Sequence, residues 1–208
     1  MDRLGIVNKA LLKLGQTPVA NLEDTDNRVV SILAIYESVR DTEQTSYRWT
    51  FCTKRFILEP IKVKDTEGNV IVVAPKFGYK YQYLLPKGFL RLISIYEHPQ
   101  TGYSIEGQRL LTNLEGPLKI IVLCVEEHEC NFPPAFVEAF STKLAIEVCK
   151  RIEQDVTEKA QLMQEYLMAL SIAKKTDAIQ RATEKPVEGP WVDVRFSEVP
   201  TNDQSFRW

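Results

Sequence analysis

The segment from Ala135 to Lys185 does most to limit what this chain can fold into, because it contains neither glycine nor proline. These two residues most often end a helix, and the apolar residues of the segment recur every three or four positions, as on one helix face. They form two stripes: Phe136, Phe140, Leu144, Val148 and Ile152, then Met163, Tyr166, Leu167, Leu170 and Ala173. The phase changes near Asp155, which with Glu158 resembles a capping box. The segment therefore predicts two consecutive helices.

Residues 1–47 show the same helical period. Two apolar stripes mark two further helices: Leu4, Val7, Leu11 and Leu14, then Val29, Ile32, Leu33, Tyr36 and Val39. Gly15 follows the first stripe and predicts a left-handed helix cap, with Pro18 just beyond it. The run before the second stripe offers three candidates to cap the start of that helix: Asp24, Thr25 and Asp26.

Residues 49–125, between the helical regions, have the composition of β-strands. Segments such as FCTKRFILEPIKVK and LKIIVLCV are rich in β-branched and aromatic residues, which favour strands. Turn formers separate the segments at short intervals, and residues 65–69 have the composition of a hairpin turn. Short, closely spaced strands of this kind predict a small antiparallel barrel or sandwich.

The order of these regions predicts an α+β fold. We expect an antiparallel helical bundle of four main helices from both chain ends, an inserted small antiparallel β-domain and an extended C-terminal arm. The predicted boundaries are 1–48 for the first part of the bundle, 49–130 for the β-domain, 131–184 for the second part of the bundle and 185–208 for the arm.

The composition argues against two broad classes of protein. The formal net charge is −2, whereas a protein that wraps nucleic acid needs a surplus of lysine and arginine. The start of the chain lacks the pattern of a signal peptide, and the strongest apolar run, Ile120 to Val125, is too short to cross a bilayer. The four cysteines show no paired spacing and are expected to be reduced thiols. We expect a cytoplasmic protein, or one assembled in the cytoplasm.

Few residues offer metal-binding or cofactor chemistry, since the only histidines are His98 and His128. The sharpest candidate is the zinc-ligand set Cys124, His128 and Cys130. Its spacing lacks the paired ligands and the nearby fourth ligand of a zinc site. The sequence has no P-loop, no nucleophile elbow and no dinucleotide fingerprint. We therefore predict no metal, no cofactor and no catalytic residue.

Two acidic clusters leave one catalytic alternative open. They consist of Glu126, Glu127 and Glu129, and of Glu23, Asp24 and Asp26. A pair of carboxyl groups can hydrolyse a glycosidic bond, so a cell-wall glycan hydrolase is the alternative to a non-enzymatic protein. Acids in loops are more often solvated or cap a helix, where the helix dipole favours them, and this interpretation is preferred.

Two further patterns have both a binding and a packing interpretation. Tyr79, Tyr81 and Tyr83 lie among lysines, as in proteins whose rings stack on bases. Their alternation is also that of a half-buried strand, which the acidic balance of the chain favours. The apolar stripe of the last helix is either a coiled-coil seam or part of the core, and core packing explains it without a partner.

The C-terminal segment EGPWVDVRFSEVPTNDQSFRW carries aromatic residues without a regular period over its length. Each predicted element already has an apolar face of its own, so these aromatics are surplus to the core. Aromatic and arginine side chains are typical interface anchors. We predict that the arm binds a partner through Trp191, Arg195, Phe196, Phe206, Arg207 and Trp208. The alternative is that the arm folds back on its own chain.

The chain resembles phage head-to-tail adaptors of the tail tubular protein A type. The resemblance rests on an LG-x-x-P-V-x-x-L turn before a helix that closes on W-x-F, together with YLLPKGFLRLISIY, IEGQRLLTN and FPPAFVEAFSTKLAIEVC. It covers nearly the whole chain in element order. The residues that match the turn and the W-x-F pattern are Leu14, Gly15, Pro18, Val19 and Leu22, then Trp49 and Phe51.

This resemblance implies a structural protein of the virion, at the head-tail junction. Such adaptors form a ring of twelve copies below the portal protein, extend the DNA channel and carry the tail nozzle or tube protein. DNA passes without sequence-specific binding, which suits a near-neutral chain, and no membrane is involved. The arm is then expected to bind the portal or a neighbouring subunit. A tail-completion (terminator) protein that caps a tube is a further alternative.

Overall fold

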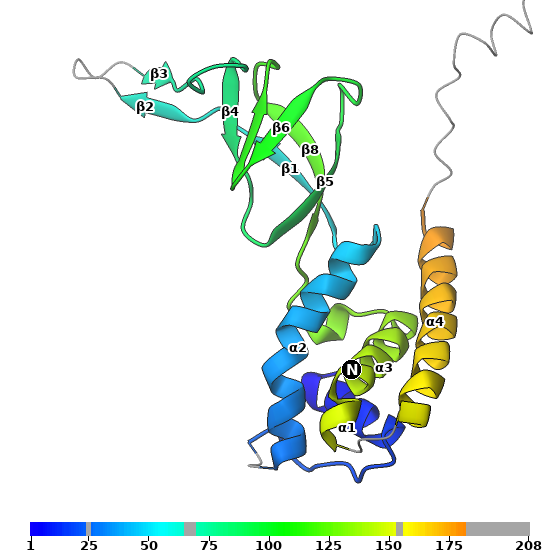
Figure 1. The fold of residues 1–208 in the computed structure, drawn as a ribbon. Coiled ribbons are helices and arrows are strands. Elements are labelled where there is room, and N and C mark those ends of the chain that lie inside the picture. The colour runs from blue at the N-terminus through cyan, green and yellow to red at the C-terminus, as the bar shows by residue number, and fades with distance from the viewer. Residues whose placement is uncertain (24–25, 65–69, 153–155, 182–208) are drawn as a thin grey trace, which may run out of the picture.

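The computed structural model describes residues 1–23, 26–64, 70–152 and 156–181, which form four α-helices and three small antiparallel sheets (Figure 1). The helices are α1 (Arg3–Lys13), α2 (Asn27–Ser46), α3 (Pro134–Ile152) and α4 (Val156–Ile179). The strands are β1 (Thr53–Leu58), β2 (Lys62–Lys64), β3 (Val70–Val72), β4 (Tyr81–Leu84), β5 (Phe89–Ile95), β6 (Tyr103–Glu106), β7 (Arg109–Thr112) and β8 (Leu118–Cys124). The strands gather beyond the C-terminal end of α2, so the helices and the sheets form two lobes (Figure 1).

Helix α1 ends as its sequence predicts. Gly15 has a φ of 66°, the left-handed conformation that glycine adopts without steric cost. The Gly15 N–H donates to the Leu12 carbonyl at 3.1 Å, and the Gln16 N–H donates to the Leu11 carbonyl at 3.0 Å. These two bonds are those of a Schellman motif, which satisfies the last carbonyls of the helix. The predicted glycine cap is confirmed.

The predicted start of α2 and the division between α3 and α4 are also confirmed. Asp26 is the N-cap of α2, and its carboxylate accepts from the Arg28 N–H at 2.9 Å. Helix α3 ends at Ile152 and α4 begins at Val156. The other predicted capping groups lie outside what the structure describes: Asp24, Thr25, Asp155 and the side chain of Glu158.

The predicted α+β fold with an antiparallel four-helix bundle is wrong in its architecture: the chain mixes the four helices with three small antiparallel sheets, and no such bundle is present among the described residues. Helices α1, α2 and α4 each pack on α3, whereas α4 makes few contacts with α1 and α2. The prediction assumed one apolar stripe on α3. Its buried apolar residues instead surround most of the helix: Phe136, Val137, Ala139, Phe140, Leu144, Ala145, Ile146, Val148 and Cys149. A helix that is apolar on most faces is a central, buried helix.

Strand β8 contributes side chains to the core of the sheets and to the core of the helices. One three-stranded sheet has the order β1-β8-β5, a second has the order β4-β7-β6, and β2 pairs with β3 as a separate ribbon. The two larger sheets share a core around Tyr83, Ile120 and Val122, while Leu123 of β8 belongs to the core of the helices. Tyr83 is fully buried and its hydroxyl donates to the Leu114 carbonyl at 2.8 Å. The strand interpretation of this tyrosine is confirmed.

Candidate functional site

The C-terminal end of α4 is hydrogen-bonded to the segment that precedes β1. The buried Asp177 carboxylate accepts from the Thr50 N–H at 2.8 Å and from the Thr50 hydroxyl at 2.6 Å. Arg181 donates to the other oxygen of Asp177 at 3.0 Å and also donates to the Tyr47 hydroxyl. Arg181, the last described residue, is therefore held at the boundary between the helices and the sheets.

The residues of the family pattern that are buried have structural roles. Trp49 is 1% exposed, its indole N–H donates to the Glu43 carbonyl at 2.9 Å, and its ring lies 5.1 Å from that of Phe136. The Phe51 ring lies 4.9 Å from the same Phe136 ring. Leu22 is partly buried against the helical core, and Pro18 is exposed. Trp49 and the partly buried Phe51 thus hold the helices to the start of β1.

A buried carboxyl group, Glu43, lies where α2 meets α4. Glu43 is 3% exposed, and the Tyr166 hydroxyl lies 2.9 and 3.0 Å from its two carboxyl oxygens. Burial raises the pKa of Glu43 above its ordinary value, although the hydrogen bond from Tyr166 opposes the shift. The sequence analysis missed this residue. It continues the apolar stripe of α2 four residues after Val39, and a charge at such a position indicates a buried polar contact.

Replacing Glu43 by glutamine should remove one source of pH dependence. The raised pKa means that the folded chain holds the Glu43 proton to higher pH than the unfolded chain, so this contribution to stability is lost as pH rises from about 4.5 through the folded-state pKa. Urea unfolding over a pH series should show the Glu43→Gln variant gaining stability relative to the wild type across that range. The exposed Glu127, changed to glutamine, serves as the control. A difference that stays constant with pH would contradict the assignment.

The outward face of α4 carries exposed apolar side chains. Leu162 and Ala173 are buried against α3, with Tyr166 and Leu170 partly buried beside them. The predicted core stripe was therefore wrong in part, because Met163 and Leu167 are 38% and 57% exposed. Three more residues lie on the face turned away from α3, by the helical period: Met168, Ile172 and Ile179, which are 68%, 60% and 85% exposed. We call these three residues the α4 outer stripe.

A groove of about 310 Å³ lies between α2 and α3. It is lined on α2 by Ile35, Ser38, Val39 and Thr42, and on α3 by Lys143 and Glu147. Lys143 pairs with Glu147 at 2.8 Å at one side of the groove. All of the residues that line this α2/α3 groove belong to α2 and α3, and none belongs to α4.

In the acidic cluster on which the hydrolase alternative rests, Glu126 and Glu129 form hydrogen bonds or ion pairs within the chain. Burial acts to raise the pKa of Glu126, but hydrogen bonds from the His128 N–H and Asn131 outweigh it and the pKa is lowered. Burial also acts on Glu129, and the Arg3 guanidinium, 2.8 Å away, holds its pKa below the ordinary value. A general acid requires a raised pKa, which neither carboxyl has. Glu127 is exposed.

The structure does not bring the three candidate zinc ligands, Cys124, His128 and Cys130, into a metal site. Cys124 is buried in β8, whereas Cys130 is exposed in the short 3₁₀ helix at Glu129–Asn131. Within the described ranges, no three His, Cys, Asp or Glu side chains are grouped to hold a metal ion. In the same ranges, none of the helices has the length and apolar character needed to cross a membrane.

The predicted anchors of the C-terminal arm all fall outside the described residues, which end at Arg181. They are Trp191, Arg195, Phe196, Phe206, Arg207 and Trp208. No protein-family model and no curated protein sequence matches the chain. The candidate functional features on the helices are the two uncovered surfaces described above, the α4 outer stripe and the α2/α3 groove.

Proposed function

We propose that this chain is a structural head-to-tail adaptor of a tailed phage. It would form a ring below the portal protein, extend the DNA channel and provide the platform for the tail nozzle or tube protein. One observation carries the proposal: the chain has two different uncovered surfaces on its helices, the α4 outer stripe and the α2/α3 groove.

These two surfaces suit a ring because one copy cannot bring them together. The α4 outer stripe is directed away from α3, whereas α3 forms one wall of the α2/α3 groove. When two different surfaces of identical copies meet, the interface is heterologous, and repeating it closes a ring or extends a filament. The resemblance to tail tubular protein A adaptors supports the ring and supplies the number twelve.

The charges of the chain also support a conduit with no chemistry of its own. The formal net charge of −2 gives DNA little to bind, and the lowered pKa values of Glu126 and Glu129 do not suit a general acid. The C-terminal arm is proposed to bind the portal or a neighbouring subunit within the particle. If the portal surface templates the ring, the chain is expected to stay monomeric in the absence of the portal.

Electron microscopy of assembled particles tests the proposal. The expected result is a ring of this chain directly below the portal. A position at the far end of a tail tube, together with binding to tube subunits and not to the portal, would show a tail-completion protein instead. Peptidoglycan cleavage that disappears when Glu126, Glu127 and Glu129 are replaced would favour the hydrolase and overturn the proposal.

A further inference from the structure

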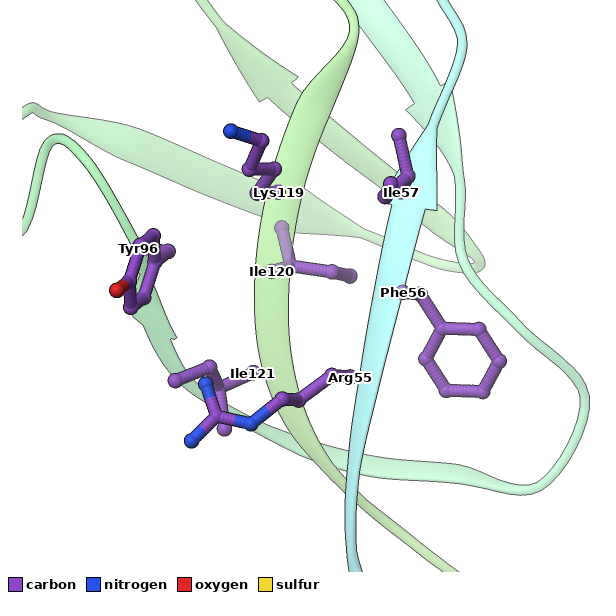
Figure 2. A pocket seen from close by; sticks show the side chains of 7 residues that line it. All are labelled: Arg55, Phe56, Ile57, Tyr96, Lys119, Ile120 and Ile121. Atoms are coloured by element: carbon purple, nitrogen blue, oxygen red, sulfur yellow. The ribbon is translucent and has the colours of Figure 1, made fainter.

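The outward face of the β1-β8-β5 sheet carries a groove of about 330 Å³ (Figure 2). We call it the sheet groove and define it by Arg55 and Ile57 of β1, Lys119 and Ile121 of β8, and Tyr96 just after β5. Ile57 is 68% exposed and Tyr96 is 61% exposed. Figure 2 shows the Arg55 side chain extending across β8 at Ile121, while Phe56 points to the other side of β1.

The strand register explains why this face is apolar. Arg55 lies opposite Ile121 and Ile57 lies opposite Lys119, and side chains of opposed residues share one face of an antiparallel pair. Two residues further along β8 on that face, Leu123 is fully buried in the core of the helices. The face is thus covered by helices at Leu123, Ile121 is still only 8% exposed, and the face opens at Ile57 and Lys119. The sheet groove is the uncovered continuation of the helical core.

The charges at the sheet groove favour an acidic occupant. Arg55 forms no ion pair with any residue in the described part of the chain. Lys119 contacts Glu97 at 2.5 Å, and both of these side chains are about half exposed. An occupant that brings apolar side chains for the exposed Ile57 and Tyr96, with a carboxylate for Arg55, would match the groove.

We propose that the sheet groove binds the C-terminal arm of the same chain, through residues 191–199. The described part of the chain ends at Arg181, and Asp177, four residues before it, is hydrogen-bonded to Thr50. Thr50 precedes Arg55 by five residues, which is about 17 Å of extended chain. Trp191 follows Arg181 by ten residues, which reaches about 33 Å. The arm is long enough to enter the groove of its own chain.

The sequence of the arm matches the groove in chemistry. Within WVDVRFSEV, the apolar Val192, Val194 and Phe196 occupy alternate positions. An extended segment places alternate side chains on one side, so in the proposed complex these three would lie together toward Ile57. Glu198 continues the same alternation and is the acid available to Arg55. Because the arm and groove belong to one chain, binding is intramolecular, at an effective concentration in the millimolar range.

This inference goes beyond the adaptor function and does not depend on it. An arm held on its own sheet stays folded back on the free chain. A portal or neighbouring subunit that binds the same aromatics would have to displace it. Failure of the ring proposal leaves the sheet groove unaffected, and failure of the groove assignment leaves the ring intact.

Hydrogen exchange of the full-length chain at low concentration tests the inference. The backbone amides of residues 191–199 should be protected in the wild type, and protection should fall at least about tenfold in Ile57→Asp and in Arg55→Glu. Ile71→Asp is the matched control, because Ile71 is 52% exposed on β3, outside the groove. Absence of protection in the wild type, or protection unchanged by the groove variants, overturns the proposal.

Disulfide trapping separates an intramolecular arm from an exchanged one. In a Cys130→Ser background, which removes the exposed native thiol, a chain carrying Ile57→Cys and Val194→Cys should oxidise to a disulfide-bonded monomer. The pair Ile71→Cys and Val194→Cys should not. A covalent dimer from the groove pair would show that the arm of another copy is bound, which overturns the intramolecular assignment.

Discussion

Replacing Trp49 by alanine should lower the free energy of unfolding by about 3–5 kcal/mol, the range for removing a large buried aromatic side chain. Trp49 is 1% exposed, and its ring lies 4.9 Å from that of Tyr47 and 5.1 Å from that of Phe136. It joins α2, α3 and the start of β1, so the cavity cannot be closed by moving one element. Urea unfolding monitored by circular dichroism measures the loss.

Two further variants keep this prediction testable if the alanine variant does not fold. Trp49→Phe retains a ring but removes the hydrogen bond to the Glu43 carbonyl, and should lose less than Trp49→Ala. Phe77→Ala removes an aromatic ring that is 87% exposed and should change stability by no more than about 0.5 kcal/mol. A loss at Trp49 as small as that at Phe77 would show that the aromatic cluster contributes little.

Helix boundaries were predictable from the sequence because each depends on a few neighbouring residues. Gly15 takes the left-handed conformation whatever α1 packs against, and Asp26 caps α2 through the N–H of Arg28, two positions along the chain. The hairpin around residues 65–69 follows the same logic, since β2 and β3 pair on either side of it. The turn itself lies outside the described residues.

The packing of the helices was not predictable from stripes alone. An apolar stripe in the sequence indicates that one face of a helix is buried, but it does not indicate how many other helices pack against that helix. Val137, Ala145 and Ile146 lie off the predicted stripe of α3 and are nevertheless buried in the core of the helices. On α4, two adjacent apolar faces look alike in sequence, and only the structure shows that Leu162 is buried while Met168 is exposed.

The α4 outer stripe and the α2/α3 groove depend on this packing of the helices, so the sequence pattern did not predict them. Because α3 is central and α4 covers one side of it, the α2/α3 groove stays open, which a closed bundle would not allow. The contact made by Asp177, in contrast, could have been predicted from the sequence. Asp177 lies four residues after Ala173 on the buried face of α4, and a carboxylate at that position indicates a hydrogen-bonded contact.

The combined variant Met168→Glu and Ile172→Glu should prevent the chain from assembling as a ring on portal-bearing heads. Both side chains are exposed in the single chain, at 68% and 60%, so the folded chain should tolerate the change. Burying an unpaired carboxylate in an interface is costly, and each 1.4 kcal/mol lost weakens association about tenfold. Every interface of a ring carries the same change, so the penalty multiplies. The copies of the chain bound per head, measured by gel densitometry, should fall to background.

A matched control and a charge pair decide whether the α4 outer stripe meets the α2/α3 groove. Leu12→Glu alters an apolar residue of α1 that is 59% exposed and should leave assembly intact. Ser38→Lys in the groove, combined with Ile172→Glu, should bind more copies per head than Ile172→Glu alone, because opposite charges then face each other across the interface. If the double variant recovers nothing and Ser38→Glu alone has no effect, the groove is not the surface that receives α4, and the heterologous interface argued above does not exist.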